Sequence, residues 1–124
     1  GWPFFSGTVL QNSGAPSSLV NPLLVYAVGN GPFEGSGIVL GGIYFGATAS
    51  INEKYVFGDR NGTIWATPLD TVQNSSIDSA AKLENRTEDF VPDQGMIDEI
   101  VEIKADLNGR FFILDADGDL FVVP

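Results

Sequence analysis

The chain has 124 residues, with sixteen acidic against six basic residues, and it contains no Cys and no His. These counts suit one globular domain, and they exclude a disulfide framework, a Cys/His zinc site, a His general base and a Cys nucleophile within this sequence. The formal net charge of −10 argues against nucleic acid or an anionic membrane surface as a partner. No apolar run approaches the roughly 20 residues that a membrane-spanning helix needs.

Charge is distributed unevenly along the chain. Residues 1–33 carry no charged side chain, whereas ten of the sixteen acids fall between Glu88 and Asp119. A neutral segment is unusual on an exposed surface, because charged side chains keep surfaces soluble and protect strand edges. Two interpretations stay open: a loop-rich connector packed on its own domain, or a segment covered by another chain. Because the sequence opens Gly1-Trp2-Pro3, without Met or a signal-peptide pattern, we expect a processed or excised piece.

The remaining sequence is divided by turn signals. These are Asn61-Gly62, Asn108-Gly109 and Asp117-Gly118. Each is flanked by apolar, β-branched or aromatic runs and predicts a type I′ hairpin turn, in which both central residues have positive φ. The predicted strands cover 23–28, 38–45, 54–58, 63–68, 97–104, 110–114 and 120–123. Polar loops are expected over 71–79 and 86–95, and residues 79–84 suit a helical turn or a fourth short strand. With no convincing helix, the pattern predicts an all-β fold of antiparallel sheets.

Three sequons for N-linked glycosylation occur, at Asn61, Asn74 and Asn85. None has Pro in the middle position, and all three fall in predicted turns or loops, where a glycan would be solvated. Coincidental turn chemistry is the alternative, because Asn favours turns in any case. Occupied sequons would place the chain outside the cell, so we expect a secreted glycoprotein.

A second candidate site is the run from Asp115 through Asp117 to Asp119, in which carboxylates alternate. Aspartates at positions 1, 3 and 5 of a loop can bind Ca²⁺ through their oxygens. The glycine of this run stands at position 4 rather than 6, and no Glu follows at position 12. A plain hairpin turn between two strands is the alternative interpretation.

Several segments share the motifs of one known family. They are Gly-Trp-Pro-Phe-Phe at 1–5, Gly-Gly-Ile-Tyr-Phe-Gly at 41–46, Tyr-Val-Phe-Gly-Asp at 55–59, Gly-Thr-Ile-Trp-Ala at 62–66 and Gly-Arg-Phe-Phe-Ile-Leu-Asp at 109–115. Their order and spacing resemble the C-terminal part of the glucose/sorbosone dehydrogenase family, six-bladed β-propellers whose soluble members use pyrroloquinoline quinone. The resemblance implies about two blades, incomplete on their own, within one domain over 1–124. Residues 1–33 would be a neutral connector with a first strand, 34–85 one blade and 86–124 the closing blade.

The resemblance also bears on catalysis. Quinone-using members carry a basic residue after the aromatic pair of the strand that matches 41–46, and arginines shortly before the last blade. Here Gly46 follows Phe45 directly, and residues 91–98 include acids but no base. Because carboxylate recognition relies on Arg or Lys, we expect no quinone bound through these residues. The favoured function is a non-catalytic extracellular module with a structural role. The alternative is a fragment of a quinoprotein sugar dehydrogenase whose cofactor groups lie on missing blades.

Two blades would leave two apolar sheet faces, each of which needs a neighbour. The predicted strand 23–28 has no charged residue and suits addition to a sheet edge of another copy. We therefore expect a homo-oligomer or filament, with the rest of one longer chain as the alternative partner. Trp65 should anchor the packing between blades, on a strand whose polar Thr63 and Thr67 indicate one apolar face.

Overall fold

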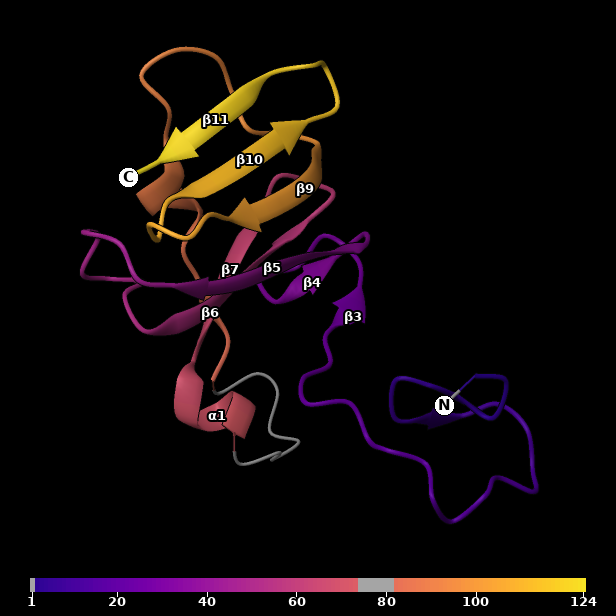
Figure 1. Cartoon of the computed structure of the whole chain (residues 1–124). Coiled ribbons are helices and arrows are strands. Elements are labelled where there is room, and N and C mark those ends of the chain that lie inside the picture. The colour runs from indigo at the N-terminus through magenta and orange to yellow at the C-terminus, as the bar shows by residue number, and fades with distance from the viewer. Residues whose placement is uncertain (1, 74–81) are drawn as a thin grey trace.

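The computed structural model describes residues 2–73 and 82–124, and two antiparallel sheets stacked on each other form its centre (Figure 1). The 4-stranded sheet contains, in spatial order, β5 (Ile38–Tyr44), β6 (Lys54–Asp59), β7 (Ile64–Pro68) and β8 (Glu84–Asn85). The 3-stranded sheet contains β9 (Ile100–Ala105), β10 (Phe111–Asp115) and β11 (Leu120–Val123), with β10 in the middle. Neither sheet closes into a barrel, and the predicted all-β class with antiparallel sheets is confirmed.

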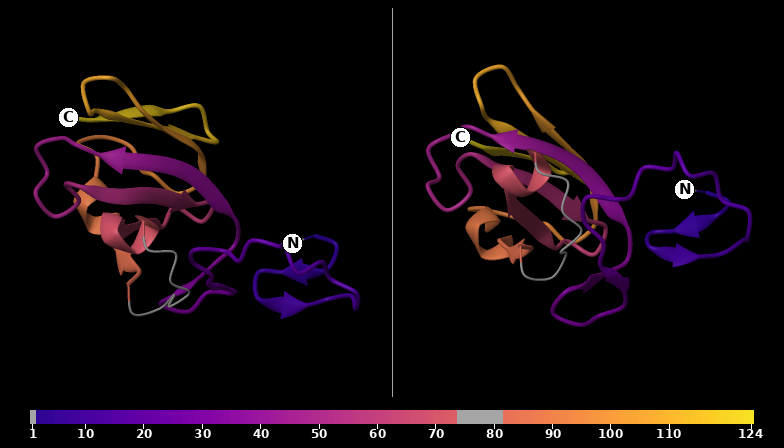
Figure 2. Two further views of the ribbon diagram at one scale, coloured as in Figure 1. Left: turned by 60° about the horizontal axis from the view of Figure 1, so that its bottom comes forward. Right: turned by 90° about the horizontal axis from the view of Figure 1, so that it is seen from below.

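The other elements are short. They are β1 (Phe5–Ser6), β2 (Val9–Leu10), β3 (Ala27–Val28), β4 (Glu34–Gly35), the helix α1 (Leu69–Gln73) and the 3₁₀ helix η1 (Thr87–Phe90). The β1–β2 hairpin lies to one side of the stacked sheets in both views of Figure 2. None of the helices in the described part of the chain has the length and hydropathy needed to cross a membrane.

The prediction of a strand over 23–28 is wrong except for Ala27–Val28, which pairs in parallel with Glu34–Gly35. Leu24 and Tyr26 instead pack their side chains on the 4-stranded sheet of their own chain, against Phe57 and Trp65. Packing of these side chains on a sheet face wins over main-chain pairing, so local β-propensity does not decide the conformation here. The neutral segment thus packs in part as a connector on its own domain.

The main core fills the space between the two sheets. It is formed by Val39, Tyr44, Ile51, Val56, Ile64, Ala66, Phe90, Ile100, Ile103, Phe111 and Ile113. The alternation of side chains along β10 explains its share, because Phe111 and Ile113 face the 4-stranded sheet while Phe112 and Leu114 face away. Tyr44 and Phe111 meet edge to face, with ring centroids 5.3 Å apart.

A second cluster covers the opposite face of the 4-stranded sheet. Trp65 is 1% exposed and packs there with Phe57 and Leu83. Trp65 lies on the face that turns away from the 3-stranded sheet, so the prediction that it anchors the packing between blades is not confirmed by these two sheets, although its burial was expected. The expectation of a single apolar face on β7 is wrong. Ile64 and Ala66 are buried in the main core on the other face of β7, and Thr67 is buried too.

The hairpin turns differ from the predicted type I′. Among the described residues only Glu53 has positive φ without being glycine, so the residue before each turn glycine has negative φ. The glycines have φ of 83° at Gly62, 86° at Gly109 and 101° at Gly118. In each turn the glycine N–H donates to the carbonyl of an aspartate three residues earlier: Asp59, Asp106 and Asp115. This is the geometry of a type I turn followed by a left-handed glycine, the usual three-residue hairpin loop.

Candidate functional site

Asp59, at the end of β6, is fully buried and accepts hydrogen bonds from three parts of the chain. The Tyr26 hydroxyl donates to Oδ2 at 2.6 Å, and Ser36 donates to Oδ1 through both its N–H and its hydroxyl at 2.9 Å. The N–H groups of Gly37 and Asn61 donate at 3.1 Å. One carboxylate therefore joins the connector, the entry to β5 and the β6–β7 turn.

Opposing effects act on the pKa of Asp59. Burial by itself would raise the pKa, but the hydrogen bonds that Tyr26, Ser36, Asn61 and Gly37 donate to the charged carboxylate outweigh it and lower the pKa to about 2. Burial raises the pKa of Tyr26, and the hydrogen bond to the negative Asp59 raises it further. At neutral pH the pair is a carboxylate and a neutral phenol joined by this hydrogen bond.

Asp115, at the end of β10, repeats the position of Asp59 in the second sheet. Its Oδ2 accepts hydrogen bonds from the N–H groups of Asp98 at 3.0 Å and Glu99 at 3.1 Å, the residues just before β9. The Ala116 N–H donates to the Glu99 carbonyl at 3.0 Å, as the Arg60 N–H does to Gly37 in the first sheet. Asp98 and Glu99 use their N–H groups in these contacts, and β9 begins only at Ile100, so residues 97–99 of the predicted strand are not in it.

The two aspartates reveal a repeat that our reading of the sequence missed. In each sheet an aromatic or aliphatic strand ends in Asp, followed by one residue, then Asn or Asp, then Gly: residues 55–62 and 111–118. The repeat is visible in the sequence as a pair of matching segments. The role of its aspartates is evident only from the backbone N–H groups that donate hydrogen bonds to each carboxylate, because these come from residues distant in the sequence.

The calcium prediction for Asp115, Asp117 and Asp119 gains no support from the geometry. Asp115 Oδ2 accepts hydrogen bonds from the backbone N–H groups of Asp98 and Glu99, so this oxygen already has partners within the chain. Asp117 is exposed and accepts a hydrogen bond from the Asp119 N–H within the turn, at 3.3 Å. Among the residues that the structure describes, no three His, Cys, Asp or Glu side chains are grouped to hold a metal ion.

The sequons at Asn61 and Asn85 are exposed on the 4-stranded sheet. Asn61 lies at the tip of the β6–β7 hairpin, and its Oδ1 accepts a hydrogen bond from the Thr63 N–H at 3.0 Å. Asn85 is the last residue of β8, rather than part of a loop as expected, and its Oδ1 accepts the Thr87 hydroxyl at 2.7 Å. Asn74 lies outside the described residues.

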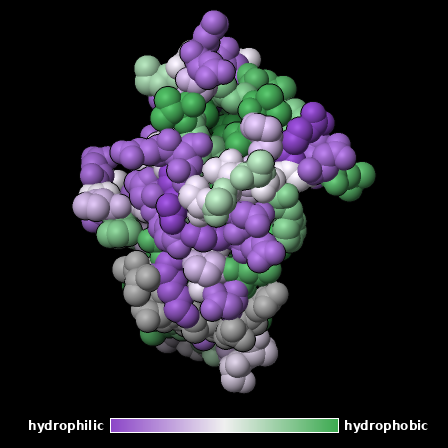
Figure 3. All heavy atoms as spheres, turned by 90° about the vertical axis from the view of Figure 1, so that its left-hand side faces the viewer, coloured by the Kyte–Doolittle hydropathy of each residue, from purple (hydrophilic) through white to green (hydrophobic). Residues whose placement is uncertain are grey.

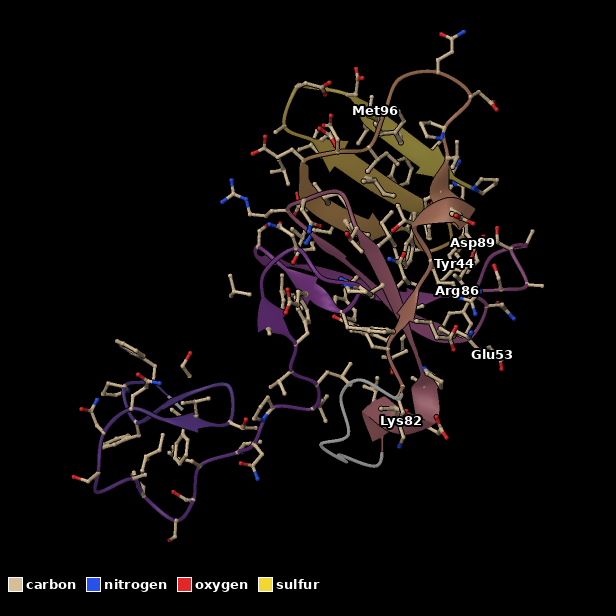
Figure 4. All side chains as sticks on the ribbon, turned by 180° about the vertical axis from the view of Figure 1, so that it is seen from behind. Tyr44, Glu53, Lys82, Arg86, Asp89 and Met96 are labelled. Carbon is tan, nitrogen blue, oxygen red and sulfur yellow. The ribbon has the colours of Figure 1, made fainter. Side chains whose placement is uncertain are left out.

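Basic side chains of the two sheets are held in ion pairs. Lys54 Nζ lies 2.6 Å from Glu84 Oε2, and Arg86 contacts the same carboxylate. Arg86 also lies 3.9 Å from Asp89, and Figure 4 labels these two residues. Burial would raise the pKa of Glu84, but the hydrogen bonds from Lys54 and Arg86 lower it. These cations are therefore engaged by the protein's own carboxylates.

Both sheets also present apolar side chains on the faces that turn away from the main core. On the first sheet a groove of 350 Å³ is lined mainly by Leu23, Leu24, Ile38, Leu40, Tyr55 and Phe57. On the second sheet Phe112, Leu114, Leu120 and Val122 form what we call the outer face. Figure 3 shows hydrophobic atoms exposed beside hydrophilic ones in the upper part of the molecule, where the second sheet lies.

Comparison of the chain with protein-family models, with curated proteins and with solved structures found no match. The assignment of a function therefore depends on the geometry and on the sequence motifs.

Proposed function

We propose that this chain is a non-catalytic structural module of a secreted glycoprotein, built from two sheets that act as blades of a β-propeller. The observation that carries the proposal is the repeated plan, in which a buried aspartate holds each sheet together and each sheet keeps an apolar face turned outward. A sheet with two apolar faces is stable when it has a neighbour on each side, so this plan favours stacking of further sheets.

The resemblance to the glucose/sorbosone dehydrogenase family supports the same architecture. The motifs at 41–46, 55–59 and 62–66 involve the adjacent strands β5, β6 and β7, and the motif at 109–115 involves β10. The strands of the first sheet fall within 34–85, and those of the second fall within 86–124. This is the division that two successive blades require.

Secretion and glycosylation are tested by expression with a signal peptide in eukaryotic cells, followed by intact-mass measurement before and after glycosidase treatment. We expect a loss of mass on treatment, because Asn61 and Asn85 are exposed and each precedes a Thr at the required spacing. Replacing Asn61, Asn74 or Asn85 by Gln should remove one glycan mass at each occupied site. Asn52→Gln, outside any sequon, is the matched control. An unchanged mass after glycosidase treatment would overturn the glycoprotein proposal.

The alternative is that the chain is part of an active quinoprotein sugar dehydrogenase, which the motif strands β5 to β7 favour. Pairing of Lys54 and Arg86 with Glu84 supports the non-catalytic reading, since a quinone with three carboxylates needs uncommitted cations. An absorbance scan and native mass spectrometry after incubation with the quinone distinguish the two. Stoichiometric bound quinone would favour the dehydrogenase.

A further inference from the structure

This inference rests on the proposed structural role and starts from the outer face of the second sheet. Phe112 pairs with Val122, and Leu114 with Leu120, so the four side chains point to the same side. Leu120 is 65% exposed and Val122 56%, while Phe112 and Leu114 are half-buried. A contiguous apolar surface of this kind marks an interaction site.

The internal repeat shows what such a face contacts. When Asp59 of the first sheet is aligned with Asp115 of the second, each residue of the outer face has an equivalent in the first sheet. In the order Phe112, Leu114, Leu120 and Val122, these equivalents are Val56, Gly58, Ile64 and Ala66. All four are buried, in the registers Val56↔Ala66 and Gly58↔Ile64. They pack on the second sheet, whose Ile100 lies close enough that a Cβ at Gly58 would be 3.0 Å from it. The same position in the plan is thus a contact between sheets.

The covering surface has an equivalent in the chain too. In the first sheet Ile38 pairs with Asp59, as Ile100 pairs with Asp115 in the second. Tyr55 and Phe57 likewise stand where Phe111 and Ile113 stand in the second sheet. These first-sheet residues line the groove, and Ile38 and Leu40 are 62% and 72% exposed. One chain therefore carries both surfaces of the contact, at opposite ends of the sheet stack.

Size and charge also match. The outer face has Leu114 where the buried face has Gly58, so its partner must offer extra space, and the groove of 350 Å³ does so. Among the residues that the structure describes, those that line the groove carry no charge. Beside the outer face of the second sheet, Lys104 Nζ lies 3.1 Å from Glu102 Oε1. The two charges of this ion pair balance each other.

We propose that a second copy of this chain places its groove on the outer face of the first, head to tail. The contact is heterologous, since the two surfaces differ, and each pair keeps one groove and one outer face free. Repetition of such contacts closes a ring or extends a filament.

The test uses two variants, each with a charge on one surface, analysed by light scattering over a concentration series. Val122→Lys alters the outer face and Leu40→Lys the groove, and because both positions are exposed we expect the monomer to fold with either change. Burying an unpaired Lys should weaken association by at least roughly tenfold, so each variant alone should remain monomeric. A mixture of the two should form dimers that grow no further. The dimer joins the intact groove of the Val122→Lys chain to the intact outer face of the Leu40→Lys chain, and its two free surfaces each carry the added Lys. Leu107→Lys, at a fully exposed turn, is the control and should assemble like the parent chain.

Three results would overturn the proposal: a monomeric parent chain at high micromolar concentration, unchanged assembly of either variant, or a mixture that stays monomeric. Circular dichroism of both variants checks that they are folded. If the parent is monomeric while glycosylated and secreted, the extracellular role stands and only the contact between copies fails. A parent that binds a separate propeller segment instead of itself would assign the outer face to the rest of a longer chain.

Discussion

At the scale of single residues, Trp65 contributes the largest buried side chain. Its ring lies 5.9 Å from that of Tyr26 and 6.1 Å from that of Phe33, measured between centroids. Trp65→Ala removes these contacts and leaves a cavity, so we expect a loss of roughly 3–5 kcal/mol in the free energy of unfolding. Urea denaturation followed by circular dichroism measures it. Trp2→Ala, at a residue 82% exposed, should cost less than about 0.5 kcal/mol, and equal effects would contradict the assignment.

The Asp59 carboxylate makes stability depend on pH. Its folded-state pKa of about 2 lies below the ordinary aspartate value of roughly 4, so the unfolded chain takes up the proton first as the pH falls. The stability that Asp59 contributes is therefore complete above about pH 4 and is lost as the pH falls towards about 2. Asp59→Asn should be less stable at pH 7 and should flatten this part of the profile.

The control for this experiment is Asp117→Asn. Asp117 is exposed in its turn, and asparagine keeps the oxygen that accepts the Asp119 N–H. Its pH profile should match that of the parent chain. If Asp59→Asn kept the parent's slope between pH 4 and pH 2, another carboxylate would be responsible for it.

At the scale of elements, the bulge in β5 contains two adjacent glycines, Gly41 and Gly42, that differ in how much space surrounds them. The register shifts between Val39 and Gly42, and a Cβ added at Gly41 would lie 1.9 Å from the Val56 carbonyl oxygen. At Gly42 the nearest atom would be 3.8 Å away. Gly41→Ala should therefore cost about 1–3 kcal/mol or more, because the backbone of β6 must move. Gly42→Ala should change stability by less than about 1 kcal/mol. Thermal denaturation compares the pair, and similar melting temperatures would mean that the bulge is placed wrongly.

At the scale of the whole molecule, the net charge of −10 acts against the proposed contact between copies. Each copy repels the next, while the described residues that line the groove are uncharged, so salt should screen the repulsion without weakening the apolar contact. We expect the dissociation constant to fall several-fold when sodium chloride is raised from about 20 mM to about 200 mM, spanning Debye lengths above and below roughly 10 Å. Sedimentation equilibrium measures it. Weaker association in salt would indicate ion pairs across the contact.

Much of the element pattern could be predicted from the sequence. The predicted strand 120–123 agrees with β11 at both ends, and the predictions for β5, β6, β7 and β10 are correct to within one residue. These strands alternate or concentrate β-branched and aromatic residues and end at glycine turns, which are local signals. The type of turn was missed, because a glycine with positive φ suits both a type I′ turn and the three-residue loop.

The sequence by itself determined the all-β class, the strand positions and the burial of Trp65, since each depends on local propensity and apolar patterning. Only the tertiary structure decided the roles of Asp59 and Asp115, whose backbone donors come from Ser36 and Asp98 and their neighbours. It also decided that residues 23–26 pack on a sheet instead of joining one. The physical reason is the same in both cases: these contacts join residues distant in the chain, and no local pattern specifies which distant partner offers an N–H group or an apolar face.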